Sequence, residues 1–257
     1  MKHPLRTLLL AVCCGLAAAC TQRQERLKLM SYNIRNGIGI DNIQDIGRIA
    51  RVILREAPDL VALQELDSAT LRVDGRYIPG ELGRMTGMHA TFGRAIGFAG
   101  GSYGIGLLSR TEPLAVRSIP LPGREEARVL LMAEFPDYTV CITHLSLTPE
   151  DRLASLPIIR EATDTCRKPV LLAGDFNTGN AAAVLAGLGG GFRILSDTTR
   201  MTFPSDNPAV RIDYIRGRGL PTSATVAESA VDHTATASDH CPLWVTLVWK
   251  RGKQPGK

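Results

Sequence analysis

Short apolar runs that end at polar residues are the feature of this sequence that most constrains its fold. Eight such runs have the length of a β-strand, and turn-forming residues separate them. They span residues 27–34, 60–66, 105–109, 129–135, 139–145, 169–173, 210–215 and 243–249. Because 44% of the residues are hydrophobic and 21% are charged, the chain can bury these runs in one core, which excludes a disordered protein.

Helical spacing is confined to a few segments. Apolar residues recur every three or four positions from residue 43 onward, and Asp41 or Asn42 is the expected N-cap of that helix. Residues 148–165 form a second expected helix with a kink at Pro157, and the small residues of 181–188 form a third. Many strands with few crossover helices predict an α/β fold in which two mixed β-sheets pack face to face with helices outside.

The first nineteen residues predict a signal peptide. A basic start with Lys2 and Arg6 precedes an apolar stretch that is too short to span a bilayer. Ala17-Ala18-Ala19-Cys20 then resembles the lipobox of bacterial lipoproteins, in which the cysteine is lipidated and becomes the first residue of the mature chain. We therefore expect residues 1–19 to be removed and Cys20 to be lipidated. Plain secretion with cleavage nearby is the alternative.

A single domain is expected over residues 27–249, because no linker or change in composition interrupts them. Residues 20–26 precede it as a polar tether, and residues 250–257 follow it as a basic tail. A lipidated chain would lie in the cell envelope, periplasmic or at the cell surface, whereas an unlipidated chain would be secreted. Loss of residues 1–19 lowers the formal net charge from +5 to +3, so charge alone does not demand an anionic partner.

Cysteine usage fits an exported protein without a zinc site. Cys141, Cys166 and Cys241 would be the remaining thiols beside a lipidated Cys20. None of them stands in the C-x-x-C spacing that is typical of structural zinc ligands. One disulfide or three buried thiols both remain open.

Polar side chains suited to catalysis follow the predicted strands where the strands end. They are Asn33, Glu65, His144, Asp175, Asn177, Asp213, Asp239 and His240. Carboxylate and amide oxygens would hold a hard divalent cation, and imidazoles would transfer protons. Singly, these residues have plain structural explanations, because Asn33 suits a turn, and Asp175 and Asn177 suit helix caps.

The motifs around these residues resemble the endonuclease/exonuclease/phosphatase superfamily, which includes pancreatic deoxyribonuclease, exonuclease III and neutral sphingomyelinases. The resemblance covers roughly residues 27–249. It rests on seven motifs in the family's order, namely Ser31-Tyr32-Asn33-Ile34-Arg35, Leu63-Gln64-Glu65, Leu108-Ser109-Arg110, Thr143-His144-Leu145, Gly174-Asp175-Phe176-Asn177, Arg211-Ile212-Asp213-Tyr214 and Ser238-Asp239-His240. It implies a four-layer α/β/β/α sandwich and cleavage of phosphate esters that depends on Mg²⁺ or Mn²⁺.

The resemblance also implies a role for each metal-site residue and for a catalytic histidine. Glu65 matches the family's metal ligand, and Asn33 and Asp239 stand where they would complete the coordination directly or through water. His240 matches an imidazole that is paired with a carboxylate, here Asp213. In the family this imidazole activates water or contacts the phosphate.

Further roles follow from the same resemblance. Asp175 and Asn177 match the pair that orients the nucleophilic water, and His144 occupies the position of a leaving-group acid or phosphate donor. Arg35 stands where it would contact substrate phosphate, and Arg128 resembles an arginine common in bacterial members. The stretch before Leu108 lacks the Asn or acid that often faces this site, so His144 has no predicted partner.

The function expected from these observations is a monomeric, metal-dependent phosphodiesterase of the cell envelope, nuclease-like in chemistry, with nucleic acid as one candidate substrate. A phospholipid head group or a small phosphorylated metabolite is the alternative substrate on the same site. Phosphomonoester hydrolysis and a non-catalytic module that binds an anionic ligand are further alternatives. Aromatic residues make up 5% of the chain, and we find no aromatic loop of the kind that enters bilayers.

Overall fold

The computed structural model describes residues 24–189 and 191–250. The expected signal peptide (1–19), the lipidation site Cys20, the first part of the tether and residues 251–257 of the tail lie outside the described residues. Among the described residues, no helix has the length and apolar character needed to cross a membrane.

The first β-sheet has six strands, and its edge-to-edge order differs from the chain order. In spatial order they are β11 (Thr225–Val231), β12 (Leu243–Lys250), β1 (Gln24–Asn33), β2 (Leu60–Ser68), β4 (Gly101–Ser109) and β3 (His89–Phe98). β1 and β2 run parallel, and the other neighbours are antiparallel. The sheet is therefore mixed, as the sequence predicts.

The second sheet also has six strands and is also mixed. Its order is β5 (Ala115–Leu121), β6 (Arg128–Glu134), β7 (Thr139–His144), β8 (Val170–Asp175), β10 (Asp213–Arg218) and β9 (Arg193–Ile194). β7 and β8 are the parallel pair. Asp175 at the end of β8 pairs in register with His144 of β7 and with Asp213 of β10, so three candidate site residues form one row across the sheet.

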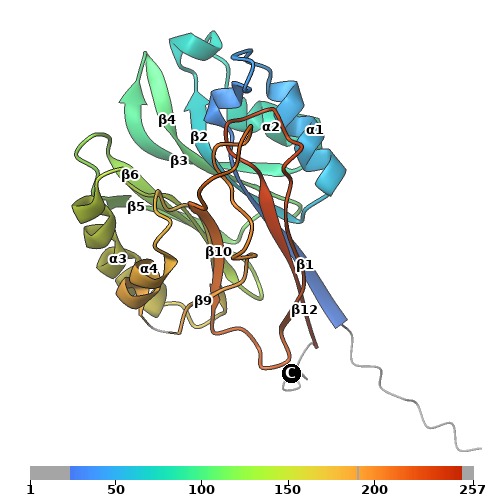
Figure 1. Ribbon diagram of the computed structural model, residues 1–257, viewed down its shortest axis with the longest axis vertical. Helices are drawn as coiled ribbons and strands as arrows, with labels where there is room; N and C mark the ends of the chain where they lie inside the picture. Colours follow the sequence, from blue (N-terminus) through green and yellow to red (C-terminus); the bar gives the residue numbers. More distant parts are fainter. Residues whose placement is uncertain (1–23, 190, 251–257) are drawn as a thin grey trace, which may run out of the picture.

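Helices cover the outer face of each sheet and complete four layers. Figure 1 shows α1 (Ile46–Glu56) and α2 (Ile78–Thr86) on one side of the molecule, and α3 (Pro149–Asp164) and α4 (Ala181–Leu188) on the other. The helix-facing residues of the first sheet pack against the first pair, and those of the second sheet pack against α3 and α4. The expected α/β/β/α sandwich is confirmed.

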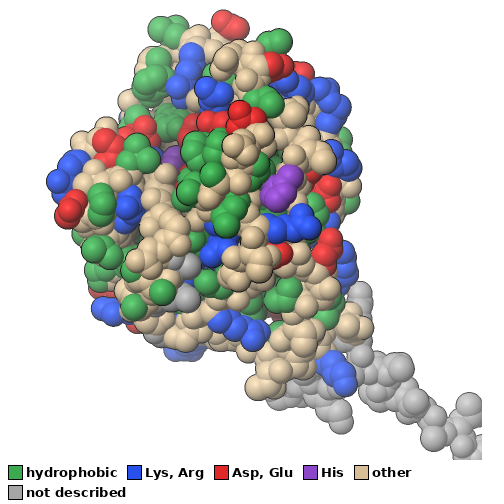
Figure 2. Space-filling model, viewed as in Figure 1, with side chains coloured by type: hydrophobic (Ala, Val, Ile, Leu, Met, Phe, Trp, Pro, Cys, Tyr) green, Lys and Arg blue, Asp and Glu red, His purple; other side chains and the backbone are tan. Residues whose placement is uncertain are grey.

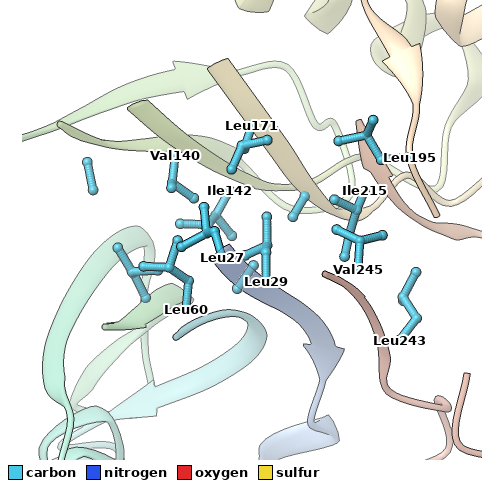
Figure 3. Packing of buried hydrophobic residues seen from close by; sticks show 14 of the residues in the cluster. Leu27, Leu29, Leu60, Val140, Ile142, Leu171, Leu195, Ile215, Leu243 and Val245 are labelled. Atoms are coloured by element: carbon cyan, nitrogen blue, oxygen red, sulfur yellow. The ribbon is translucent and has the colours of Figure 1, made fainter. Parts of the chain in front are cut away.

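The largest part of the core lies between the two sheets. Figure 3 shows Leu27, Leu29 and Leu60 of the first sheet facing Ile142 and Leu171 of the second. The next residue on β1, Met30, packs instead toward the helices. Central strands are thus buried on both faces, which explains why they appear in the sequence as continuous apolar runs rather than alternating ones.

Two expectations about element ends were wrong. α1 begins at Ile46 with Asp45 as N-cap, because the Asp45 carboxylate accepts from the amide of Arg48, whereas Asp41 accepts from the amide of Ile43 in the preceding loop. β1 begins at Gln24, inside the expected tether, because Gln24 pairs with Lys250 of β12. The expected helix over residues 148–165 is present as α3 with Pro157 inside it, and the kink at Pro157 stays a prediction.

Four strands and one α-helix among the described residues were not predicted from the sequence. The strands β3, β5, β9 and β11 lie at sheet edges, where most of their side chains are partly or fully exposed and the apolar signal is weak. α2 is short and carries internal glycine. The described cysteines are free thiols, of which Cys141 and Cys241 are buried and Cys166 is partly exposed, so the structure has neither the disulfide nor the three buried thiols left open above.

Gly174 provides a test of how tightly β7 and β8 pack beside Asp175. Its φ is 153°, and a Cβ added there would lie 1.9 Å from the carbonyl oxygen of Thr143. Gly174→Ala is therefore expected to lower the free energy of unfolding by at least about 3 kcal/mol. Gly75→Ala is the control. Gly75 has a φ of 72°, but a Cβ added there would meet no atom within 4 Å, so this variant should lower the free energy of unfolding by only about 1 to 2 kcal/mol.

Urea denaturation of both variants measures this difference. If Gly174→Ala lowers the free energy of unfolding by no more than Gly75→Ala does, then β7 and β8 can move apart at no cost in stability.

Candidate active site

The predicted polar residues meet at one edge of the sandwich, which we call the polar edge. It is formed by Asn33 and Glu65 from the first sheet and by His144, Asp175 and Asp213 from the second. Asn33 pairs in register with Gln64, which precedes Glu65. Each sheet therefore contributes polar side chains that strand pairing aligns with one another. Side chains that are distant in sequence are thereby brought within hydrogen-bonding range of one another.

Glu65 reaches the polar edge through a bulge in β2. The register between β2 and β4 shifts between Leu63 and Leu66, and Glu65 adopts a φ of 60°, which is rare for a residue with a side chain. Such a backbone costs on the order of 1–3 kcal/mol and persists only where the surroundings enforce it. Here β1 and β4 enforce it from both sides.

Asn33 is the central contact of the polar edge. Its Nδ2 donates to Oε1 of Glu65 at 3.0 Å and to Oδ2 of Asp175 at 3.2 Å, and it lies 3.5 Å from Nε2 of His240. Its Oδ1 accepts from the amide of Arg35 at 3.1 Å. The Asn33 side chain is only 1% exposed, and its amide group therefore fixes the spacing between Glu65, Asp175 and His240.

His240 is held by Asp213. Its Nδ1 donates to Oδ2 of Asp213 at 3.0 Å, and its Nε2 lies 3.7 Å from Oδ2 of Asp175. Burial alone would lower the pKa of His240, but the Asp213 carboxylate outweighs it and raises the pKa to about 10. His240 is therefore a buried cation at neutral pH, with its second N–H facing Asp175.

His144 lies on the other side of Asp175 and carries no charge at neutral pH. Its Nε2 is 3.5 Å from Oδ2 of Asp175. Burial lowers the pKa of His144 to about 4, even though Asp175 opposes this shift. A neutral imidazole donates one hydrogen bond and accepts another, so His144 can contact a phosphate or a leaving oxygen without being an acid at pH 7.

Asp175 and Asn177 form one local turn at the end of β8. Oδ1 of Asp175 accepts from the amide of Asn177 at 2.8 Å, which leaves Oδ2 for the two imidazoles. Nδ2 of Asn177 donates to the carbonyl of Leu145 at 2.8 Å, and Asn177 has a φ of 50°. The Asn177 amide thus also ties the loop after His144 to the loop after Asp175.

Arg35 and Asp239 contact each other at the open side of the site. Nε of Arg35 lies 3.5 Å from Oδ2 of Asp239, and both side chains are about one third exposed. Arg35 is thus exposed enough to meet an incoming phosphate, and Asp239 offsets part of its charge.

Arg128 is only 7% exposed and is held by two acids. Its Nη1 lies 3.0 Å from Glu126 and its Nη2 3.3 Å from Glu125. With Glu126, His144 and Tyr103 it lines a cavity of about 10 Å³, which is room for one water. The structure thus places Arg128 beside His144, a neighbour that sequence motifs did not indicate.

The donor set of the polar edge fits a hard divalent cation. Burial raises the pKa of Glu65, with Asp239 and Asp175 adding to the rise, and burial with Asp213 raises the pKa of Asp175. This excess of buried negative charge is what a cation would neutralise.

A second grouping of donors overlaps this set. Asp175, Asp213 and His240 place ligand atoms within 4.8 Å of one another. Oδ2 of Asp213 and Nδ1 of His240 are already bonded to each other, whereas Oδ1 of Asp213 is buried without a partner among the described residues. A cation held by Asp175 and Asp213 would compete with the Asp213–His240 hydrogen bond, whereas a cation held by Glu65 and Asp239 would leave that bond intact.

Sequence motifs missed the loop that packs on His240. The ring of Phe203 lies 4.8 Å from the His240 ring, and the residues beside it bond to the Asp213 and Asp239 backbones. These residues stand in a segment without apolar periodicity, so no sequence signal pointed to them.

A buried carboxylate–imidazole pair beside converging carboxylates, at one edge of an α/β/β/α sandwich, suits hydrolysis of phosphate esters. Residues 30–240 match the model of the Endonuclease/Exonuclease/phosphatase family, and the chain belongs to that family. None of the curated proteins matches the chain.

Several solved structures share the fold. An endonuclease/exonuclease/phosphatase from Beutenbergia cavernae is 24% identical with a TM-score of 0.69, and the match covers 88% of this chain and 72% of that one. A mannosyl-6-phosphatase from Bacteroides thetaiotaomicron is 19% identical with a TM-score of 0.68, over 86% and 99%. TDP2 from D. rerio in complex with a single-strand DNA product is 21% identical with a TM-score of 0.65, over 86% and 98%.

The two imidazoles of the metal-free protein are expected to titrate far apart. At pH 7, NMR of protein labelled with ¹⁵N-histidine and treated with chelator should show a neutral His144 ring and a doubly protonated His240 ring, from their pKa values of about 4 and about 10. Asp213→Asn should lower the pKa of His240, because burial remains while the carboxylate that raises this pKa most is lost.

The sign of the accompanying stability change follows from the raised pKa. The Asp213–His240 pair stabilises the fold fully below pH 6.5 and loses this contribution as the pH rises toward 10. If His144 and His240 both titrate near the ordinary histidine pKa of 6.5, the assignment of one neutral and one charged ring is wrong.

Proposed function

We propose that the protein is a Mg²⁺- or Mn²⁺-dependent phosphodiesterase that hydrolyses its substrate by in-line attack of water. One observation carries the proposal. His240 is fixed by Asp213, and its Nε2 faces Asp175 and Asn33 beside Glu65. A charged imidazole next to oxygen ligands suits an anionic ester that binds together with a divalent cation.

In this proposal Glu65 and Asp239 hold the metal with Asn33, directly or through water. A bound divalent cation neutralises phosphate charge and stabilises the leaving oxygen. Asp175 orients the attacking water with Oδ2, which accepts from Asn33 at 3.2 Å and has a second lone pair, whereas Oδ1 is held in the turn with Asn177.

The remaining residues bind the phosphate. The protonated His240 donates from Nε2 to a phosphate oxygen, and the Asp213 carboxylate keeps it charged through turnover. His144 supplies one neutral hydrogen bond from the other side of Asp175. Arg35 and Arg128 add guanidinium groups at the two sides of the site.

Nuclease-like cleavage of a phosphodiester is the first choice of reaction, and one fold neighbour is bound to a DNA product. A small phosphorylated molecule is the second candidate, and one observation favours it. Residues 24–250 contain 24 Lys and Arg against 25 Asp and Glu, because the other six basic residues lie in the two terminal segments. Figure 2 shows basic side chains interspersed with acidic ones on the face drawn, whereas duplex binding needs several phosphate contacts.

Hydrolysis assays test the proposal. The chain from Thr21 onward is incubated with Mg²⁺ or Mn²⁺ and with plasmid DNA, RNA, sphingomyelin, bis-p-nitrophenyl phosphate or sugar phosphates. We expect turnover that chelator abolishes, and a loss of about 100-fold or more in kcat/KM for Asp175→Asn and His240→Gln. His89→Gln is the matched control, since His89 is exposed at the start of β3, and it should retain full activity.

Each result of this panel has a distinct meaning. Cleavage of nucleic acid supports the nuclease-like diesterase. Cleavage of small esters or lipid alone would support the same active site with a different substrate class. If a folded protein hydrolyses none of the substrates, an anion-binding module is favoured.

We further propose that the chain is anchored to the cell envelope through a lipid on Cys20. The support is the lipobox-like Ala17-Ala18-Ala19-Cys20 after a basic and apolar start. In a bacterial host, the full chain should incorporate labelled fatty acid and partition into detergent, and Cys20→Ser should do neither. An unlabelled wild-type chain in the culture medium would favour plain secretion.

A further inference from the structure

The segment from Thr202 to Ser205 crosses the loop that carries Asp239 and His240. Thr202 and Ser205 are almost completely buried, at 0% and 5% exposure, although both are polar and lie in a loop between β9 and β10. Buried hydroxyl groups require hydrogen-bond partners, so their bonds show what this segment holds in place.

Thr202 joins the two halves of the Asp213–His240 pair. Its Oγ1 accepts from the amides of Ile212 at 3.2 Å and Asp213 at 3.3 Å. Its carbonyl accepts from the amide of Cys241 at 2.8 Å. One residue therefore fixes the backbone at Asp213 and the backbone immediately after His240, which lie on different strands and loops.

Ser205 holds the residues before His240. Its amide donates to the carbonyl of Asp239 at 2.7 Å, and its Oγ donates to the carbonyl of Ser238 at 2.6 Å. The hydroxyl of Ser238 in turn donates to the carbonyl of Asn33 at 2.7 Å. The loop is thus held from the Thr202–Ser205 side and from the end of β1.

Phe203 covers the imidazole itself. Its ring centre lies 4.8 Å from that of His240, with 45° between the ring planes. The ring is fixed by backbone pairing of Phe203 with Val210, at 3.0 and 2.9 Å. This tilted contact between an aromatic ring and the imidazole restricts rotation of the imidazole.

We propose that Thr202, Phe203 and Ser205 form a positioning clamp that sets the hydrogen bond between Oδ2 of Asp213 and Nδ1 of His240. This rests on the proposed function only for its effect on rate, because the hydrogen bond can be observed without a substrate. The clamp touches neither substrate nor metal, so its residues act through His240.

Thr202→Val in the full chain tests the clamp, because valine keeps the shape of threonine and removes the oxygen that accepts from Asp213. We expect kcat to fall about 10- to 100-fold because His240 loses its alignment, while KM changes less than about threefold, since the other groups proposed to bind the phosphate and the metal stay in place. Thr202→Ser keeps the oxygen and should remain within about threefold of wild type. Phe203→Leu should lower kcat less than Thr202→Val, and Phe203→Tyr should restore it.

The control is Thr163→Val. Thr163 is equally buried, and within the described part of the chain its hydroxyl bonds to the carbonyl of Arg160 in the same helix, at 3.1 Å. Thermal unfolding of both valine variants fixes a temperature at which each is folded. Loss of kcat in Thr202→Val alone then separates positioning from a general loss of stability.

A spectroscopic measurement makes the test independent of any substrate. In chelator-treated wild-type protein the Nδ1 proton of His240, bonded to a buried carboxylate, should give a far-downfield proton resonance. Thr202→Val should broaden or remove it, and Thr202→Ser and Thr163→Val should retain it. An unchanged resonance in a folded Thr202→Val protein would overturn the clamp, and a lost resonance without turnover by wild type would instead reject the proposed function and keep the clamp.

Discussion

The hydrogen bond between Asp213 and His240 is the interaction on which the rest of the site depends. Both groups are buried, at 1% and 5% exposure, and their atoms lie 3.0 Å apart. A single charge at this depth would be neutralised by a shift of its pKa, whereas a close and well-aligned pair offsets the desolvation of both partners. Asp175 then faces the protonated imidazole of His240 on one side and the neutral imidazole of His144 on the other.

The sandwich explains how such a site can be rigid. His144, Asp175 and Asp213 stand in register on three neighbouring strands of the second sheet, so strand pairing alone sets their spacing. Asn33 and Glu65 come from the first sheet, and the apolar core between the sheets holds the two sets at a fixed distance. The positive φ of Glu65 is tolerated because ladders on both sides of β2 enforce it.

Sequence patterns predicted the buried part of this arrangement well and the exposed part poorly. Central strands such as β1, β2 and β8 are apolar on both faces, and the residues that end them could be located without a structure. The edge strands β3 and β5 expose most of their side chains, so pairing rather than burial defines them. The N-cap of α1 was misplaced because Asp41, Asn42 and Asp45 are all good caps, and only the backbone path selects among them.

The contacts of Thr202 and Phe203 show a second limit of sequence patterns. Thr202 bonds to Asp213 across eleven positions and to Cys241 across a much longer span, and neither contact follows a strand or helix period. Residues of this kind acquire their roles only when the chain has folded.

Charge distribution adds a final constraint on how a substrate is bound. Since acidic and basic side chains nearly balance over residues 24–250, no strong overall field attracts an anion from a distance. Attraction must arise locally, from His240, from Arg35 and Arg128, and from a cation held by the carboxylates. Screening by salt falls most heavily on exposed and widely separated charges, and His240 and Arg128 are buried. Substrate recognition at this site is therefore expected to depend on close fit around one phosphate more than on long-range attraction, whether that phosphate belongs to a nucleic acid or to a small ester.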